Sequence, residues 1–394
     1  MEERKRVLLL GGTGAIGTHV APELVRRGFS VTVTSRSAHT SDDRRIEYRQ
    51  GDAKDDAFLD ALLAERFDAI VDFMIYTTAA FSARCEKLLS HTDHYVFLSS
   101  YRVYGDAGCA PITEESPRLL ESVNDPEYLK TDEYGLAKAR QEDLLRASGR
   151  RNYTIVRPSI TYAGDRFQLG TMEANEFLVR ALKGKAVIFP KEMLPKRAAM
   201  TWAGDVGRMI ARLVCSESAY GETYTAASAE TQTWNSVLKL YQKILGMQVK
   251  QVPLSVYRDV VGRPWQIKYD RMLHRIIDNN KILLATGMKQ SELMPLSDGL
   301  RIELAKFAAH PQFKNVDEAM QARFDRVIAD LEAQSKKASK KDEPPKGGGI
   351  KGMLRRVRWY RKRHVLMKVV KKKLYQITPL RKAVHGIKRV FRRS

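Results

Sequence analysis

The sequence predicts an α/β fold with a doubly wound parallel sheet, a smaller C-terminal part and a basic helical tail. Two observations predict the sheet. Short apolar runs alternate with amphipathic helical stretches as far as Arg157, which is typical of parallel strands joined by helices. A glycine-rich segment at residues 11–17 also separates the first apolar run from the first helical stretch.

The apolar runs indicate strands that are buried on both faces. In chain order, strands are expected at residues 7–10, 30–34, 46–49, 69–73, 95–99 and 153–157. Helices are expected between them, around residues 20–28, 57–65, 79–89 and 134–148. Beyond Pro158 the alternation weakens, and helices are expected at residues 170–183, 206–214, 234–245 and 317–334.

The charge is concentrated at one end of the chain. The 394 residues include 68 Lys and Arg against 46 Asp and Glu, a net charge of +22. Residues 335–394 hold 22 of the basic residues and two acidic ones, so this segment carries +20 and the rest about +2. Residues 335–349 have the composition of a linker, and residues 350–394 place apolar residues at helical spacing among Lys and Arg.

Cysteine usage and hydropathy exclude several classes of protein. The three cysteines are isolated and form no C-x-x-C pair, so neither a disulfide framework nor a metal site is expected. No apolar run approaches the length of a spanning helix or of a signal-peptide core. We therefore expect a cytoplasmic protein.

The glycine-rich segment is suited to binding the phosphates of a dinucleotide. Gly11 allows a tight turn, Gly14 lets the backbone approach a pyrophosphate, and Gly17 lets the helix pack close to the strand. The helix N-terminus then offers free N–H groups and the positive end of its dipole. The predicted cofactor-binding residues of this turn include Thr13 and Ile16 as well.

The residues at the end of the second strand are expected to contact the adenine ribose of the dinucleotide. NAD-binding proteins usually carry an acidic residue there, whereas this chain has Ser35 and Arg36. A hydroxyl beside a guanidinium suits a 2′-phosphate, so NADP is favoured and NAD is the alternative. Asp52, just after the third strand, is expected to reach the adenine.

Tyr134 and Lys138 are candidate catalytic residues. They are four residues apart on a predicted helix and share a face. A nearby ammonium favours the ionised form of a phenol, so Tyr134 could exchange a proton with a substrate hydroxyl. Lys138 could also hold the nicotinamide ribose. Ser100 follows a buried strand and could donate a hydrogen bond to the reacting oxygen, with Ser99 as the alternative.

Four motifs in register resemble the extended short-chain dehydrogenase/reductases, the NAD-dependent epimerase/dehydratase family of nucleotide-sugar enzymes. They are Gly11-x-x-Gly14-x-x-Gly17, Ser99-Ser100-x-x-Val103-Tyr104-Gly105, Tyr134-Gly135-x-x-Lys138 and Val156-Arg157-Pro158. The resemblance implies a Rossmann domain at residues 1–165, a mainly substrate-binding part at residues 166–334 that returns some segments to the Rossmann domain, and a bound NAD or NADP. It assigns Ser100, Tyr134 and Lys138 to catalysis.

The chain departs from the family pattern at three places. Tyr101 and Arg102 stand where the 4,6-dehydratases carry Asp-Glu, so dehydration is not expected. Residues 157–160 read Arg-Pro-Ser-Ile where epimerases usually have Arg-Tyr-Phe-Asn, which leaves Arg166 and Arg197 as the candidates for a substrate diphosphate. Residues 73–76, Phe-Met-Ile-Tyr, replace small residues and suggest an altered nicotinamide pocket.

The resemblance predicts a nucleotide-sugar epimerase or ketoreductase that serves cell-surface polysaccharide synthesis and is compatible with a homodimer. The alternative is a non-catalytic NADP-binding or RNA-binding relative. For the tail, residues 350–394, we favour peripheral attachment to an anionic membrane, on the inner face. Nucleic acid or a protein partner is less favoured, and a solvated tail without a partner is favoured least.

Overall fold

The structure is a computed structural model that describes residues 4–341. The chain divides into two compact units, Met1–Asp325 and Arg326–Ser394. Helix α14 (Glu318–Lys341) is longer than predicted and takes in the start of the expected linker. The remainder of that linker and the expected tail lie outside the described residues, and the predicted boundary near residue 165 stays a prediction. Among residues 4–341, no helix has the length and apolar character needed to cross a membrane.

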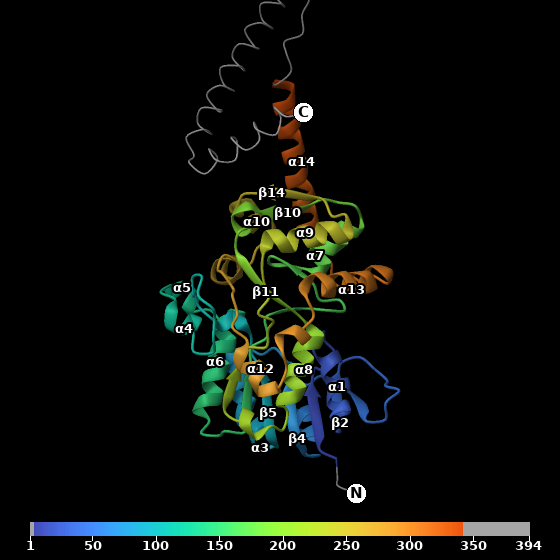
Figure 1. Ribbon diagram of the computed structural model, residues 1–394, viewed down its shortest axis with the longest axis vertical. Helices are drawn as coiled ribbons and strands as arrows, with labels where there is room; N and C mark the ends of the chain where they lie inside the picture. Colours follow the sequence, from blue (N-terminus) through green and yellow to red (C-terminus); the bar gives the residue numbers. More distant parts are fainter. Residues whose placement is uncertain (1–3, 342–394) are drawn as a thin grey trace, which may run out of the picture. The chain divides into compact units, whose positions relative to one another are not determined.

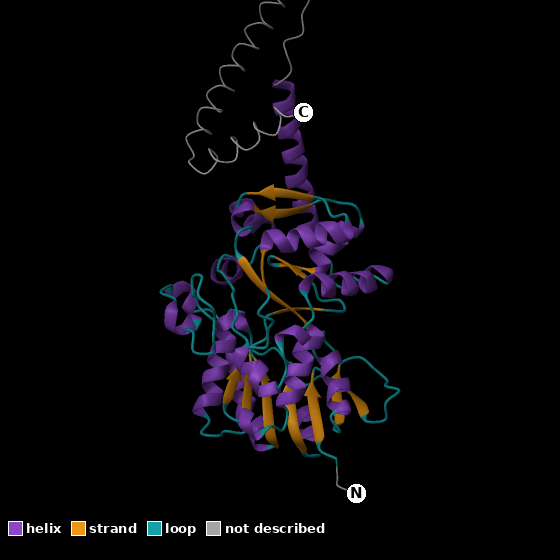
Figure 2. Ribbon diagram, viewed as in Figure 1, coloured by secondary structure: helices purple, strands orange, loops and turns teal. Residues whose placement is uncertain are grey.

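The first unit contains a seven-stranded parallel sheet, in the lower part of Figure 2, with the strand order β12-β6-β5-β4-β1-β2-β3. Its strands are β1 (Arg6–Leu10), β2 (Ser30–Ser35), β3 (Ile46–Gln50), β4 (Phe67–Asp72), β5 (Thr92–Leu98), β6 (Tyr153–Val156) and β12 (Glu222–Tyr224). The predicted fold class and all six predicted strands are confirmed. β12 was not predicted, because three residues with one acidic member give no periodic signal.

Helices cover both faces of the sheet, which explains the continuous apolar runs. Val7 and Leu9 of β1 belong to a core with α1 (Gly17–Arg26), α8 (Ala203–Leu213) and α12 (Asn280–Thr286), the helices seen in front of the sheet in Figure 1. The alternate residues, Leu8 and Leu10, face a second core. It contains α2 (Asp56–Leu63), α3 (Thr78–Ser90) and α6 (Tyr134–Ala147). A strand buried on both sides has no polar face to alternate with.

The remaining strands form smaller sheets that the sequence did not predict. β7 (Ile160–Tyr162) pairs with β11 (Arg197–Trp202), which pairs with β13 (Thr231–Thr233); β10 (Val187–Pro190) pairs with β14 (Val249–Val252), and β8 (Gln168–Leu169) with β9 (Met172–Glu173). The associated helices are α7 (Ala174–Leu182), α9 (Trp234–Leu245), α10 (Leu254–Val261) and α13 (Leu296–Ala309). The helix expected from residue 170 begins at Ala174, because residues 172–173 pair in β9 and Glu176 caps the helix start.

The strand order places a crevice above β1 and β4. The chain winds from β1 toward β3 on one side and from β4 toward β6 on the other, so the connections diverge at the carboxyl ends of these two neighbours. Ligands of open α/β sheets bind at such a switch point. The glycine-rich turn after β1 and residues 73–76 after β4 therefore border the same space.

Candidate active site

The glycine-rich turn has the shape that a dinucleotide pyrophosphate requires. Gly11 has a φ of +70°, and its N–H donates to the Thr34 hydroxyl at 2.8 Å. A Cβ on Gly17 would lie 2.3 Å from the carbonyl oxygen of Gly12, so α1 packs against the turn more closely than any other residue would allow. A Cβ on Gly14, by contrast, would meet nothing within 4 Å beyond its chain neighbours, so this glycine faces open space.

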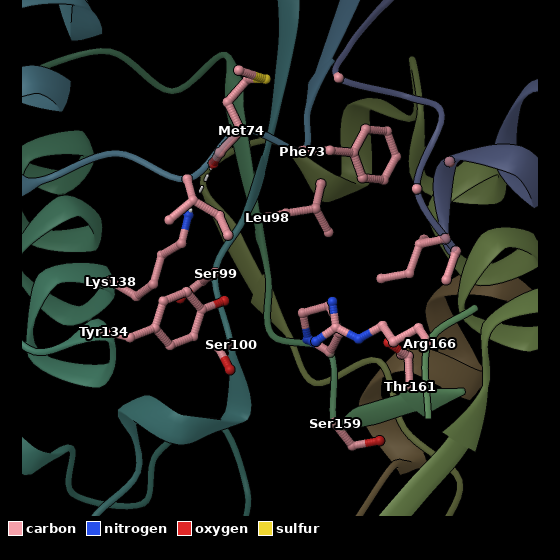
Figure 3. Close-up of a pocket in the computed structure, with 17 residues that line it drawn as sticks. Phe73, Met74, Leu98, Ser99, Ser100, Tyr134, Lys138, Ser159, Thr161 and Arg166 are labelled. Atoms are coloured by element: carbon pink, nitrogen blue, oxygen red, sulfur yellow. Dashed lines mark hydrogen bonds between the residues drawn. The ribbon is translucent and has the colours of Figure 1, made fainter. Parts of the chain in front are cut away.

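A cavity of about 160 Å³ lies beside this turn at the switch point. It is bordered by the turn itself, the residues after β4 and β5, the start of α6 and the β7 region. The lining residues are Gly11, Gly14, Ala15, Ile16, Gly17, Phe73, Met74, Ile75, Leu98, Ser99, Ser100, Tyr134, Lys138, Pro158, Ser159, Thr161 and Arg166. Figure 3 shows Tyr134 and Lys138 on one side of this cavity and Arg166 and Thr161 on the other.

Tyr134 and Lys138 lie one turn apart at the start of α6 and both line the cavity. The Lys138 ammonium donates to the Met74 carbonyl at 3.5 Å and lies 4.4 Å from the centre of the Phe97 ring. Burial lowers the pKa of Lys138 to about 8, against the opposing influence of Asp72 and Glu142. Within the described residues the Tyr134 hydroxyl has no hydrogen-bond partner, so it can accept one from a ligand.

The two serines after β5 have different surroundings. The Ser99 hydroxyl donates to Glu142 at 2.6 Å, and Glu142 is paired with the buried Arg157. Ser100 instead accepts the backbone N–H of Arg102 at 3.2 Å, which leaves its own proton available. The Ser99 proton is thus used in a hydrogen bond within the protein, whereas the Ser100 hydroxyl can donate a hydrogen bond to a ligand in the cavity.

Asp72, at the end of β4, is a buried carboxylate that the sequence reasoning missed. It accepts hydrogen bonds from the Tyr95 hydroxyl at 2.8 Å, the Tyr76 hydroxyl at 3.2 Å and the Met74 N–H at 2.8 Å. Burial raises its pKa, although these donors and Lys138 oppose the shift. The sequence carries a signal for Asp72, because an acidic residue at the end of an otherwise apolar strand next to β1 indicates a functional position.

Met74 and Ile75 give the cavity an apolar wall. The Met74 sulfur lies 2.6 Å from the position that a Cβ on Gly11 would occupy, so this side chain rests on the glycine turn. Ile75 lines the cavity with 60% of its surface exposed. Phe73 also lines the cavity, whereas Tyr76 does not and donates to Asp72 instead, so the altered nicotinamide pocket stays a prediction.

The other predicted cofactor residues lie at the carboxyl edge of the sheet but outside the cavity lining. Ser35 ends β2 and accepts the Ser37 N–H at 3.2 Å, and the following Arg36 is exposed. Asp52 follows β3, is exposed, and accepts the Lys54 N–H at 2.9 Å. Thr13 is half-buried in the glycine turn. Their roles stay predictions.

The structure separates the two arginines that were predicted to bind substrate. Arg166 is exposed and lines the cavity, following a tight turn in which residues 163 and 166 form a β-bridge. Arg197 is exposed at the start of β11 and is not among the lining residues; its N–H donates to the His274 ring at 3.3 Å. Ser159 and Thr161, which line the cavity near Arg166, were not predicted.

Comparison with known proteins agrees with this geometry. A family model described as NAD(P)H-binding matches residues 11–183. The 2'-dehydrokanamycin reductase of Streptomyces kanamyceticus is 26% identical over 267 residues, which cover 65% of this chain and 70% of the reductase. The UDP-glucose 4-epimerase of Neisseria meningitidis serogroup A is 28% identical over 174 residues, 36% of this chain. The chain thus spans only 47% of that epimerase.

Solved structures share the fold at low sequence identity. The UDP-glucose 4-epimerase of Bifidobacterium longum, in complex with NAD+ and UDP, matches with a TM-score of 0.60 and 18% identity, covering 78% of this chain and 99% of the epimerase. The dTDP-glucose 4,6-dehydratase of Bacillus anthracis in complex with NAD matches with a TM-score of 0.59 and 17% identity, covering 78% and 97%. The family model thus shows an NAD(P)H-binding domain at residues 11–183, and the solved structures show that the chain shares the fold of NAD-binding epimerases and dehydratases.

Proposed function

We propose that this protein is an NAD(P)-dependent epimerase or ketoreductase that acts on a secondary alcohol or ketone of a nucleotide sugar. The observation that carries the proposal is that Ser100, Tyr134 and Lys138 border one cavity with the glycine turn. That turn fits a dinucleotide, because Gly14 is open toward the cavity and Gly17 has no room for a side chain. The bound nicotinamide would supply hydride transfer.

The side chains that line the cavity would transfer the proton and hold the substrate and cofactor in position. Tyr134 gives a proton to the substrate oxygen during reduction and takes it back during oxidation. Ser100 donates a hydrogen bond to the same oxygen and fixes its position. The Lys138 ammonium favours the phenolate of Tyr134 and binds a ribose hydroxyl of the cofactor. The apolar side chains of Met74 and Ile75 border the space beside the reacting carbon.

The substrate class rests on two observations. Arg166 is a cation on the side of the cavity opposite Tyr134, and its side chain makes no ion pair within the described residues, so it can bind a diphosphate. The names of several relatives include UDP-glucose. Arg197, predicted for the same role, would need a substrate that extends beyond the cavity. The proposed product serves cell-surface polysaccharide synthesis.

The pH dependence of turnover follows from the burial of Lys138. Because its pKa is lowered to about 8, the ammonium is present below that pH and is lost as the pH rises through it. We therefore expect kcat/KM to fall above pH 8, measured across the range from about pH 6.5 to about pH 9.5. A Lys138→Arg variant carries a guanidinium that stays protonated, so its residual activity should not show this fall. An identical fall in the variant would assign the titration to another group.

Cofactor identity and reaction type can be tested on the purified full-length protein. Native mass spectrometry is expected to show one bound dinucleotide, with NADP favoured over NAD because of Ser35 and Arg36. An epimerase should retain the cofactor through turnover, whereas a ketoreductase should release the oxidised form and consume NAD(P)H in proportion to product. A protein that binds the dinucleotide but turns over no nucleotide sugar with either cofactor would contradict the enzymatic proposal.

The basic segment is proposed to attach the enzyme to an anionic membrane surface. The +20 charge of residues 335–394 is interspersed with apolar residues, including Trp359 and Phe391. Each basic residue at such a surface contributes about 1 kcal/mol. We expect the full chain to bind phosphatidylserine vesicles in low salt and to bind phosphatidylcholine vesicles poorly. Removal of residues 335–394 should abolish this binding and leave activity unchanged.

Two results would contradict membrane attachment. Vesicle binding that persists after the truncation would place the membrane contact elsewhere in the chain. Salt-dependent binding to RNA, together with no preference for anionic vesicles, would favour the nucleic-acid alternative.

A further inference from the structure

Arg102 lies over the face of the Tyr134 ring. Its guanidinium carbon is 5.2 Å from the centre of that ring, and its side chain is only 14% exposed. The guanidinium forms an ion pair with Glu133, the residue that caps the start of α6 and precedes Tyr134. The cation is therefore anchored to the same helix end that carries the phenol.

A second carboxylate holds the other side of Arg102. Asp270, which is fully buried in the segment Ile267–Arg271, lies 3.4 Å from the Arg102 Nε. Asp270 also contacts Arg271 and lies 3.2 Å from the Arg275 Nε. Burial by itself would raise the pKa of Asp270, but the surrounding guanidinium groups lower it, so this carboxylate is ionised.

The guanidinium over the ring belongs to a wider network of charges. Arg102 pairs with Glu133 and Asp270, Asp270 pairs in turn with Arg271 and Arg275, and Glu173 acts on Arg271. The charged groups on the remaining sides of Tyr134 are Lys138 on its own helix, Arg166 across the cavity, and Asp72 and Glu142, which act on Lys138. Arg102 therefore places a positive charge over the face of the Tyr134 ring.

The same network ties the site loop to the later part of the chain. The Tyr101 hydroxyl donates to Asp270 at 3.2 Å, and Arg275 donates to the carbonyls of Tyr104 and Gly105 at 3.1 and 2.9 Å. The loop that follows Ser100 is thus fixed by Asp270 and Arg275, which lie about 170 residues further along the chain.

We propose that Arg102 is a positioning residue for Tyr134. It holds the phenol ring in place and stabilises the phenolate that forms during proton transfer, and Asp270 and Glu133 hold Arg102 in turn. This role rests on the proposed function of Tyr134, because Arg102 does not line the cavity and acts only through the ring. A cation over an aromatic face is attracted to it, and more strongly when the ring carries charge.

The test compares kcat in three variants of the full-length protein. Arg102→Met should lower kcat about tenfold with unchanged cofactor affinity, a loss within the range of one desolvated cation–ring contact. Arg102→Lys keeps the charge and should recover most of the loss. Arg6→Met is the matched control: Arg6 also lies over an aromatic ring, Phe67 at 4.7 Å, and pairs with a glutamate, but at the opposite edge of the sheet. Its kcat should be unchanged.

A double-mutant cycle separates a specific role from general damage to the fold. If Arg102 acts through the phenol, adding Arg102→Met to Tyr134→Phe should cause no further loss of the residual activity. An equal loss in both backgrounds, or full kcat in Arg102→Met alone, would overturn the proposal. If Tyr134→Phe itself kept full turnover, the proposed function would fail as well, so the two failures can be told apart.

Discussion

Replacing Tyr134 with phenylalanine is expected to lower kcat by about 10³-fold while leaving NAD(P) binding intact. The substitution removes one oxygen from a half-buried side chain. Because this hydroxyl has no hydrogen-bond partner among the described residues, the stability of the fold should be unchanged. The expected loss is that of a general acid and base, which contributes about 10²–10⁴-fold. The measurement is steady-state turnover together with cofactor affinity from fluorescence titration.

Tyr220→Phe is the matched control for this variant. Tyr220 is also half-buried, but it packs against His94 and does not line the cavity. Its variant should keep full activity. Full turnover in Tyr134→Phe would refute the assignment of the acid and base, and a parallel loss of cofactor binding would show that the ring supports the dinucleotide site instead.

The central sheet could be predicted because its signals are local. Val7–Leu10 is apolar without interruption since two layers of helices bury both of its faces, and the glycines that follow mark the turn. The smaller sheets gave no comparable signal. β10 and β14 are four residues each and pair across about 60 positions of sequence, so their formation depends on tertiary contacts that no local pattern records.

The sequence predicts those residues of the candidate site that belong to sequence motifs. Ser100, Tyr134 and Lys138 were named from spacing and family resemblance, and the structure brings them to one cavity. Asp72 carried a local signal that was overlooked. The part played by Arg102 could not be inferred, because it depends on Asp270, a residue 168 positions away that becomes its neighbour only when the chain folds.

Replacing Glu142 with alanine is expected to destabilise the protein by about 3–5 kcal/mol, the usual cost of leaving one member of a buried ion pair without its partner. Arg157 is 1% exposed and donates to both Glu142 oxygens, at 2.8 and 2.6 Å. Burial alone would raise the pKa of Glu142, but Arg157 and the Ser99 hydroxyl lower it below the ordinary 4.5. Its contribution to stability is therefore present above that pH and is lost as the pH falls further. Urea unfolding at neutral pH measures the loss.

Two further variants show whether the loss comes from an uncompensated charge. Glu86→Ala removes an exposed carboxylate paired with the exposed Arg150, outside the Glu142–Arg157 pair, and should cost less than about 1 kcal/mol. Glu142→Leu combined with Arg157→Met removes both buried charges, and should recover most of the stability lost in Glu142→Ala. The Ser99 hydroxyl would lose its acceptor in the double variant, so turnover need not recover with stability. If stability is restored but turnover is not, the buried pair also holds the segment of Ser99 and Ser100 in place against the substrate oxygen. If the double variant is as unstable as Glu142→Ala, the loss comes from packing and not from an uncompensated charge.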